Sequence, residues 1–250
     1  MLQLAHTRAD MDGTKGLDPL VRDLVEILEG TRQAERELFA ALPDELRERP
    51  IRAGDWSPKD HMAHLAAWKE RQADRYDSVR RGEDPTEGSG DETDAINAEL
   101  QRATAHLSWD ETVQAAEAAH ERLVAAIRAC DPDEIRESGR LIDGTFGNGP
   151  YHALQHFTWL REAGLGIGSA PSIGLSIALE QVVERGTLPD SALGVALYNS
   201  ACYLALGGEL QRARALLPRA FRLRPDLVEL ARDDSDLAAL SDEISELAAQ

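Results

Sequence analysis

Two histidines four residues apart, His152 and His156, are the residues of this sequence whose type and spacing most directly suggest chemistry. On a helix, side chains at positions i and i+4 project from one face, one turn apart. Two imidazoles placed in this way can bind a single metal ion if a third ligand comes from another element. The pair alone is a weak indication, because histidines at this spacing are more often half-buried and satisfied by hydrogen bonds.

A third histidine is available upstream, within residues 56–68. Ser57 and Pro58 are typical of the start of a helix, and His64 would lie on that helix. Three histidines that leave one coordination position open are the arrangement of catalytic metal sites, although imidazoles suit zinc, nickel, copper and iron alike. We therefore predict a divalent metal site on His64, His152 and His156. A metal-free bundle with hydrogen-bonded histidines is the alternative.

Several neighbours of these histidines could support or surround such a site. His61 lies three residues before His64. We expect it to contact one of the metal-binding histidines without binding the ion itself, or to lie at the surface. Asp60 and Glu70 could orient a ligating imidazole, although helix capping suffices to explain Asp60. Three tryptophans are expected to anchor the core, with a place in a substrate pocket as the alternative: Trp56, Trp68 and Trp159.

The composition argues against some classes of partner. The 250 residues include 27 basic and 45 acidic side chains, which give a formal net charge of -18. Nucleic-acid binding needs clustered lysine and arginine, and a membrane span needs about 18 consecutive apolar residues, so we expect neither partner. Residues 1–16 lack the apolar core of a signal peptide and are predicted to be a flexible leader. Cys130 and Cys202 show no ligand or disulfide spacing, which favours a cytoplasmic protein.

Apolar residues at helical spacing predict an all-α fold. Asp18 with Pro19 is typical of a helix start, and Ser108 with Glu111 forms a capping box. The glycine-rich stretch 139–150 is predicted to lead into the helix of the histidine pair, which would begin at Tyr151. Four amphipathic helices joined by short and long connections indicate a four-helix bundle over residues 17–165. The predicted helices cover residues 19–42, 57–80, 93–107 continued at 109–129, and 151–163, with polar connections at 44–55 and 82–90.

The sequence changes character after residues 164–171, which hold three glycines and a proline and are predicted to be a domain boundary. Short helical blocks follow at 173–184, 191–206 and 210–223, and residues 170–250 are predicted to be a separate helical domain. Small and large residues there match the pattern of one tetratricopeptide repeat. The matching residues are Ala201, Leu204, Gly208, Ala213, Leu217, Ala220 and Pro225. Repeat modules of this kind bind protein partners; capping of the bundle or a dimer interface is the alternative.

Two short motifs carry a resemblance to a known family. The first, Trp-Ser-x-x-Asp followed by His-Leu-x-x-Trp, is met by Trp56, Ser57, Asp60, His64, Leu65 and Trp68. The second, His-x-x-x-His-x-x-Trp, is met by His152, His156 and Trp159. In these motifs residues 12–165 resemble the DinB-like superfamily of metal-binding four-helix bundles. Residues 96–97, 108–113 and 120–123 resemble its ClbS/DfsB branch.

The resemblance implies a divalent ion, zinc or nickel, on the three predicted histidine ligands. Some relatives carry out thiol-dependent transfer or isomerisation, others act in detoxification or hydrolysis, and members of the ClbS type protect against a reactive genotoxin by chemistry that need not involve a metal. The resemblance therefore implies a hydrolase or thiol-dependent transferase that acts on a small molecule, with water or a thiolate on the ion as the nucleophile. A non-catalytic binding protein is the alternative, and bundles of this kind often form homodimers.

Overall fold

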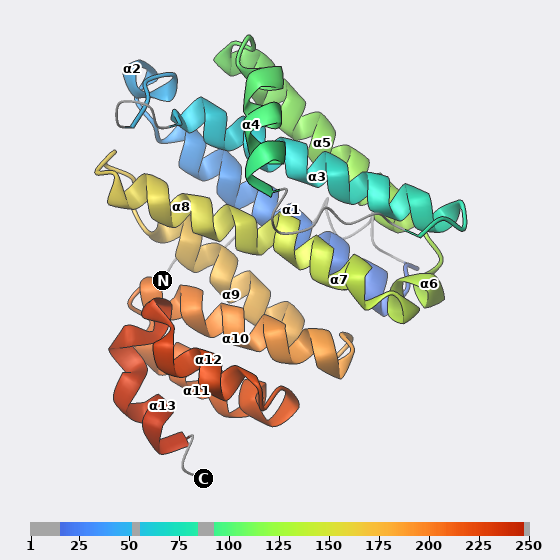
Figure 1. Ribbon diagram of the computed structural model, residues 1–250, viewed down its shortest axis with the longest axis vertical. Coiled ribbons are helices and arrows are strands. Elements are labelled where there is room, and N and C mark those ends of the chain that lie inside the picture. The colour runs from blue at the N-terminus through green and yellow to red at the C-terminus, as the bar shows by residue number, and fades with distance from the viewer. Residues whose placement is uncertain (1–15, 52–55, 85–92, 248–250) are drawn as a thin grey trace.

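The computed structural model describes residues 16–51, 56–84 and 93–247 (Figure 1). Within these ranges helices are the only regular secondary structure, which confirms the predicted all-α fold. The predicted leader and parts of two predicted connections, at 52–55 and 85–92, lie outside the described residues. None of the described helices is long and apolar enough to cross a membrane.

Four long segments form the bundle. They are α1 (Pro19–Ala40), α3 (Pro58–Arg80), α5 (Trp109–Ala129), and a kinked segment made of α7 (Gly139–Phe146), η3 (Gly147–Tyr151) and α8 (His152–Glu162). In Figure 1, α1 and α3 lie beside α5, and α7 and α8 run along the opposite side of the bundle. Each helix buries an apolar stripe, such as Leu24, Ile27 and Leu28 of α1, because residues at this spacing share one face. Shorter helices α2 (Asp44–Arg47), α4 (Thr93–Thr104) and α6 (Pro132–Glu137) lie in the connections.

The predicted caps at the starts of α1, α3 and α5 are confirmed. The Asp18 side chain accepts a hydrogen bond from the backbone N–H of Leu20 at 2.9 Å and caps α1. Ser57 and Asp60 form a capping box at α3, as do Ser108 and Glu111 at α5. Capping satisfies backbone N–H groups that have no partner inside the helix. The cap of α3 therefore fixes the first turns of the helix that carries two of the histidines.

The glycine-rich stretch 139–150, predicted only to lead into the fourth helix, is itself helical over residues 139–146. Leu141, Ile142 and Phe146 of α7 are buried in the core, and α7 continues through the π-helical turn η3 into α8. Two glycines of this stretch, Gly144 and Gly149, lie against side chains of neighbouring helices. A Cβ atom on Gly149 would lie only 2.8 Å from Cδ2 of Leu28, so any other residue there would require the Leu28 side chain to move.

The C-terminal helices begin with α9 (Ala170–Glu184), α10 (Asp190–Leu206) and α11 (Leu210–Leu223). The chain then forms α12 (Leu227–Asp233), the 3₁₀ helix η4 (Ser235–Leu240) and α13 (Ser241–Leu247). Helices α10 and α11 form a hairpin whose turn includes Gly208 at a φ of +86°. Ala201, Ala213 and Ala220 are fully buried in this hairpin, so small side chains allow the two helices to approach closely. The assignment to the tetratricopeptide repeat stays a prediction.

These C-terminal helices rest on the bundle. Helix α9 packs against α1, and their buried residues belong to one continuous apolar core. Arg185 donates to the fully buried Asp23 at 2.8 Å, and the Thr187 hydroxyl donates to the same carboxylate at 2.7 Å. The Tyr203 hydroxyl of α10 donates to the backbone carbonyl of Tyr151 at 2.9 Å. The last contact joins the hairpin to the π-helical turn directly before the first histidine of the pair.

A buried ionic cluster links α1, α3 and α5. Glu35 of α1 pairs with Lys69 of α3 and with Arg32 at 3.0 Å, and all three side chains are at most 2% exposed. Arg32 also contacts Glu117 of α5 at 2.6 Å. Burial raises the pKa of Glu35, but Lys69 and Arg32 outweigh this effect and leave the pKa below its usual value. Removal of one partner would leave an uncompensated buried charge.

Replacement of Glu35 by Gln should destabilise the bundle, because Lys69 would lose its counter-ion. We expect the free energy of unfolding to fall by about 3–5 kcal/mol in urea denaturation at neutral pH. The double variant Glu35→Gln/Lys69→Met, which removes both charges, should recover most of this loss. Equal stability of the single variant and the wild type would contradict a charge-paired cluster.

Candidate metal centre

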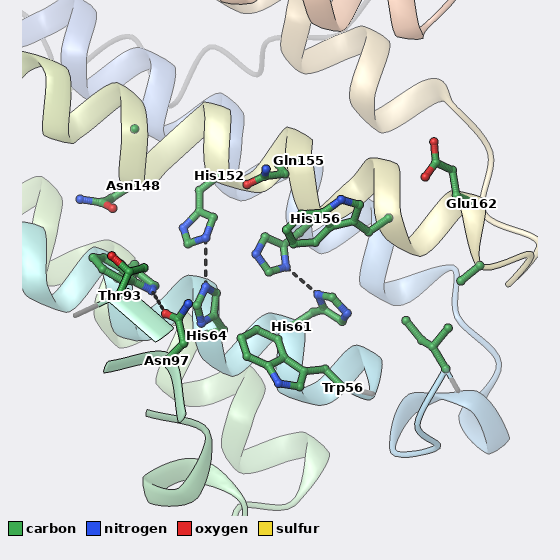
Figure 2. A pocket seen from close by; sticks show the side chains of 15 residues that line it. Trp56, His61, His64, Thr93, Asn97, Asn148, His152, Gln155, His156 and Glu162 are labelled. Atoms are coloured by element: carbon green, nitrogen blue, oxygen red, sulfur yellow. Dashed lines mark hydrogen bonds between the residues drawn. The ribbon is translucent and has the colours of Figure 1, made fainter. Parts of the chain in front are cut away.

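Helices α3 and α8 bring four histidines together inside the bundle (Figure 2). His61 and His64 lie on α3, one and two turns after its capped start, and His152 and His156 lie one turn apart on α8. The sequence separates the two pairs by 88 residues or more, so only the packing of α3 against α8 places them in one cluster.

The three predicted ligands lie close enough to share one ion. Nε2 of His64 and Nε2 of His152 face each other at 3.0 Å, and one ring nitrogen from each of His64, His152 and His156 falls within 4.8 Å of the others. Two nitrogens bound to the same tetrahedral zinc are separated by about 3.4 Å, given Zn–N bonds near 2.1 Å. The donor set therefore fits a divalent ion after a small movement of the third ring.

Burial keeps these imidazoles neutral, which is the form that binds metal. His64 and His156 are 7% and 1% exposed. Burial, reinforced by the neighbouring histidines, lowers the pKa of His64 to about 3 and that of His156 well below its usual value. Burial and the nearby Lys69 lower the pKa of His152 to about 4. Nδ1 of His64 and of His152 is buried without a hydrogen-bond partner in the described part of the chain, while both Nε2 atoms face the space between the rings.

The histidines line a cavity of about 900 Å³ whose walls combine apolar and polar side chains. The indole rings of Trp56, Trp68 and Trp159 border it, and the ring centroids of Trp56 and His64 are 4.6 Å apart. Its polar lining includes the side chains of Asn97, Asn148 and Gln155, with Glu162 farther out (Figure 2). None of the described lining residues is Lys or Arg.

A family model for the DinB superfamily matches residues 27–159. The chain belongs to the DinB superfamily. Members of this superfamily typically bind metal, and the match spans all three predicted ligands while it ends before the C-terminal helices. No curated protein and no solved structure gives a significant match to the chain.

The expectation that three tryptophans anchor the core of this DinB bundle was wrong, because all three line the cavity. Trp159 is 46% exposed, and Trp56 and Trp68 are half-buried. Their rings pack on the histidines and face the cavity, and Nε1–H of Trp68 donates to Asn97 at 3.2 Å. The core beneath is filled by aliphatic side chains and Phe157 instead.

Asp60 and Glu70, which could have oriented an imidazole, have other partners in the structure. Asp60 caps α3 through Ser57, the simpler explanation that its position in the sequence allows. Glu70 pairs with Arg122 of α5 at 2.5 Å. The charged pair that influences the pKa of His152 is Lys69 with Glu35. The sequence did not indicate this pair, because its two residues come from different helices.

His61 is part of the histidine cluster. The alternative that His61 lies at the surface was therefore wrong. It is 6% exposed, and its Nδ1 lies 2.6 Å from Nδ1 of His156. The expectation that it supports a ligand fits this contact. Its spacing of three residues from His64 already indicated a shared helix face.

The π-helical turn η3 shapes the wall of the cavity beside His152. Its Asn148 lines the cavity and donates to Gln72 of α3 at 3.2 Å. Gly149 departs from helical geometry, with φ -103° and ψ -107°, and produces the kink between α7 and α8. The sequence Gly-Asn-Gly-Pro resembles a loop, which is why sequence reasoning missed the turn.

Acid should destabilise the metal-free protein in a defined pH range. The folded-state pKa values of His64 and His152, about 3 and about 4, lie below the unperturbed 6.5. Their contribution to stability is therefore complete above pH 6.5 and is lost as the pH falls toward the folded values. Between pH 8 and pH 5, each should lower the free energy of unfolding by about 2 kcal/mol.

Urea denaturation with a chelator present, at both pH values, measures this loss. The variant His64→Gln should lose about 2 kcal/mol less than the wild type over the same interval. A wild type whose stability does not change between the two pH values would contradict the neutral, buried cluster.

Proposed function

We propose that the protein is a metal-dependent enzyme that holds a divalent ion, zinc or nickel, on His64, His152 and His156. It acts as a hydrolase or a thiol-dependent transferase on a small reactive molecule, in detoxification or self-protection. One observation carries the proposal: three neutral imidazoles from two helices, two of them buried and His152 half-buried, converge at the wall of a cavity of about 900 Å³. That volume is sufficient for a small-molecule ligand.

The chain supplies the ligands and the surroundings of the reaction. When bound, a divalent ion supplies Lewis acidity. The indoles of Trp56, Trp68 and Trp159 exclude water from part of the cavity and offer flat apolar contacts to a substrate. The side chains of Asn148 and Gln155 offer amide donors and acceptors that orient it.

The lining also bears on the charge of the substrate. No lysine or arginine occurs among the described lining residues. An anionic group of a substrate could therefore pair only with the metal ion. Glu162 adds a negative charge to the lining. The proposal therefore favours a substrate with one group that reaches the histidines and an otherwise neutral body.

We also propose a protective role, a cytoplasmic location and a contact through the C-terminal helices. The motifs shared with the ClbS/DfsB branch support a protective role, and the two free, buried cysteines fit a reducing cytoplasm. The α10–α11 hairpin supports a protein partner or a homodimer contact, since paired helices of this kind present grooves to peptides. A non-catalytic binding protein is the alternative if the histidines hold no metal.

Elemental mass spectrometry of untagged protein, purified without chelator or metal resin, tests the proposal. The wild type should contain about one zinc or nickel ion per chain, and His152→Ala/His156→Ala should contain less than about a tenth of that, because one remaining imidazole is a weak site. His120→Ala is the matched control, since His120 is buried on α5 outside the cluster, and it should keep its metal.

Metal-free wild type would contradict the proposal and favour the non-catalytic alternative. Circular dichroism of both variants establishes that loss of metal does not follow from unfolding. Screening of the loaded wild type against ester, amide and thiol-transfer substrates, with the double variant as a blank, then distinguishes a hydrolase from a transferase.

A further inference from the structure

His61 and His156 form a second histidine pair beside the three-ligand group. Their Nδ1 atoms lie 2.6 Å apart, and both residues are buried, at 6% and 1% exposure. Figure 2 shows the His156 ring between His61 on one side and the His64–His152 pair on the other. His156 therefore contacts His61 through one ring edge and faces the proposed ion position with the other.

This contact restricts where the proton of His156 can be. Two neutral imidazole nitrogens at hydrogen-bonding distance share one proton, so one ring donates and the other accepts. If His61 donated, Nδ1 of His156 would accept and its Nε2 would carry a proton, which prevents metal binding at Nε2. If His156 donates from Nδ1, its Nε2 keeps a free lone pair on the side of His64 and His152.

We propose that His61 is a positioning residue that accepts a hydrogen bond from Nδ1–H of His156 and holds His156 in the tautomer whose Nε2 binds the metal. The inference rests on the proposed function, since it presupposes that His156 is a ligand. Metal-binding histidines usually donate their second ring N–H to a carboxylate, a backbone carbonyl or water. Here another imidazole takes that place.

The surroundings of His61 fix it for this role. It lies in the first turns of α3, whose start is set by the Ser57–Asp60 capping box. The indole of Trp56 packs against its ring in an edge-on arrangement at a centroid distance of 5.6 Å, and Trp159 lies 6.4 Å away. The group of nitrogens within 4.8 Å consists of His64, His152 and His156, and His61 faces this group across His156. A supporting position fits these distances better than a fourth ligand.

Two variants of His61 separate hydrogen-bond acceptance from packing. In His61→Asn, the amide oxygen can occupy about the place of Nδ1 and accept the same hydrogen bond. In His61→Phe, a ring of similar shape remains but the acceptor is lost. We expect zinc affinity, measured by competition with a chromophoric chelator, to fall about 10- to 100-fold in His61→Phe and to stay close to the wild type in His61→Asn.

NMR of protein labelled with ¹⁵N in its histidines reads the tautomers directly. In zinc-free and zinc-loaded wild type, we expect a proton on Nδ1 of His156 and none on Nδ1 of His61. A proton on Nδ1 of His61, a four-histidine zinc site, or unchanged zinc affinity in His61→Phe would overturn the proposal. Thermal unfolding of each variant shows whether lower affinity follows from poor folding, and His61→Asn keeps the test valid if His61→Phe is unstable.

The outcomes for His61 and for the proposed function can be told apart. A wild type that binds zinc while His61→Phe binds it equally well removes the role of His61 and leaves the three-histidine centre standing. A wild type that binds no zinc removes the centre, and the tautomers of the zinc-free protein then show whether the His61–His156 hydrogen bond runs in the direction we propose.

Discussion

The packing of α3 against α8 is the contact on which the candidate site depends. It places four imidazoles side by side, three of them buried and His152 half-buried. Burial disfavours the charged form of His64, His152 and His156, and a neutral ring offers its lone pair. Neutral ring nitrogens that lie close together are energetically unfavourable unless a shared proton or a metal ion lies between them. Two nitrogen pairs, at 3.0 Å and 2.6 Å, show how tightly the rings are held.

The rest of the chain holds these two helices in place. The capping box sets the start of α3, the buried Glu35–Lys69 pair ties its middle to α1, and the π-helical turn sets the start of α8. Tyr203 extends this support to the C-terminal helices, because its hydroxyl contacts the carbonyl of Tyr151, which directly precedes His152. The hairpin is therefore in physical contact with the wall of the site, although the family match ends before it.

Local signals could be predicted from the sequence, and tertiary ones could not. Helix caps and the i, i+4 histidine pair depend on neighbours in sequence, and they led to the correct helices and to the three converging histidines. Helix α7 was missed because glycines in this stretch serve close contacts, such as those of Gly144 with Gln72 and of Gly149 with Leu28, which only packing reveals. The same holds for the tryptophans: indoles are equally suited to a core or a cavity, and the histidines that they cover come from distant segments.

A crystal structure of the zinc-loaded protein, with anomalous difference density collected at the zinc edge, tests the central claim most directly. We predict one strong peak per chain within about 2.1 Å of a ring nitrogen of each of His64, His152 and His156. Zinc bound only at surface carboxylates, with the four imidazoles still hydrogen-bonded in pairs, would contradict the account.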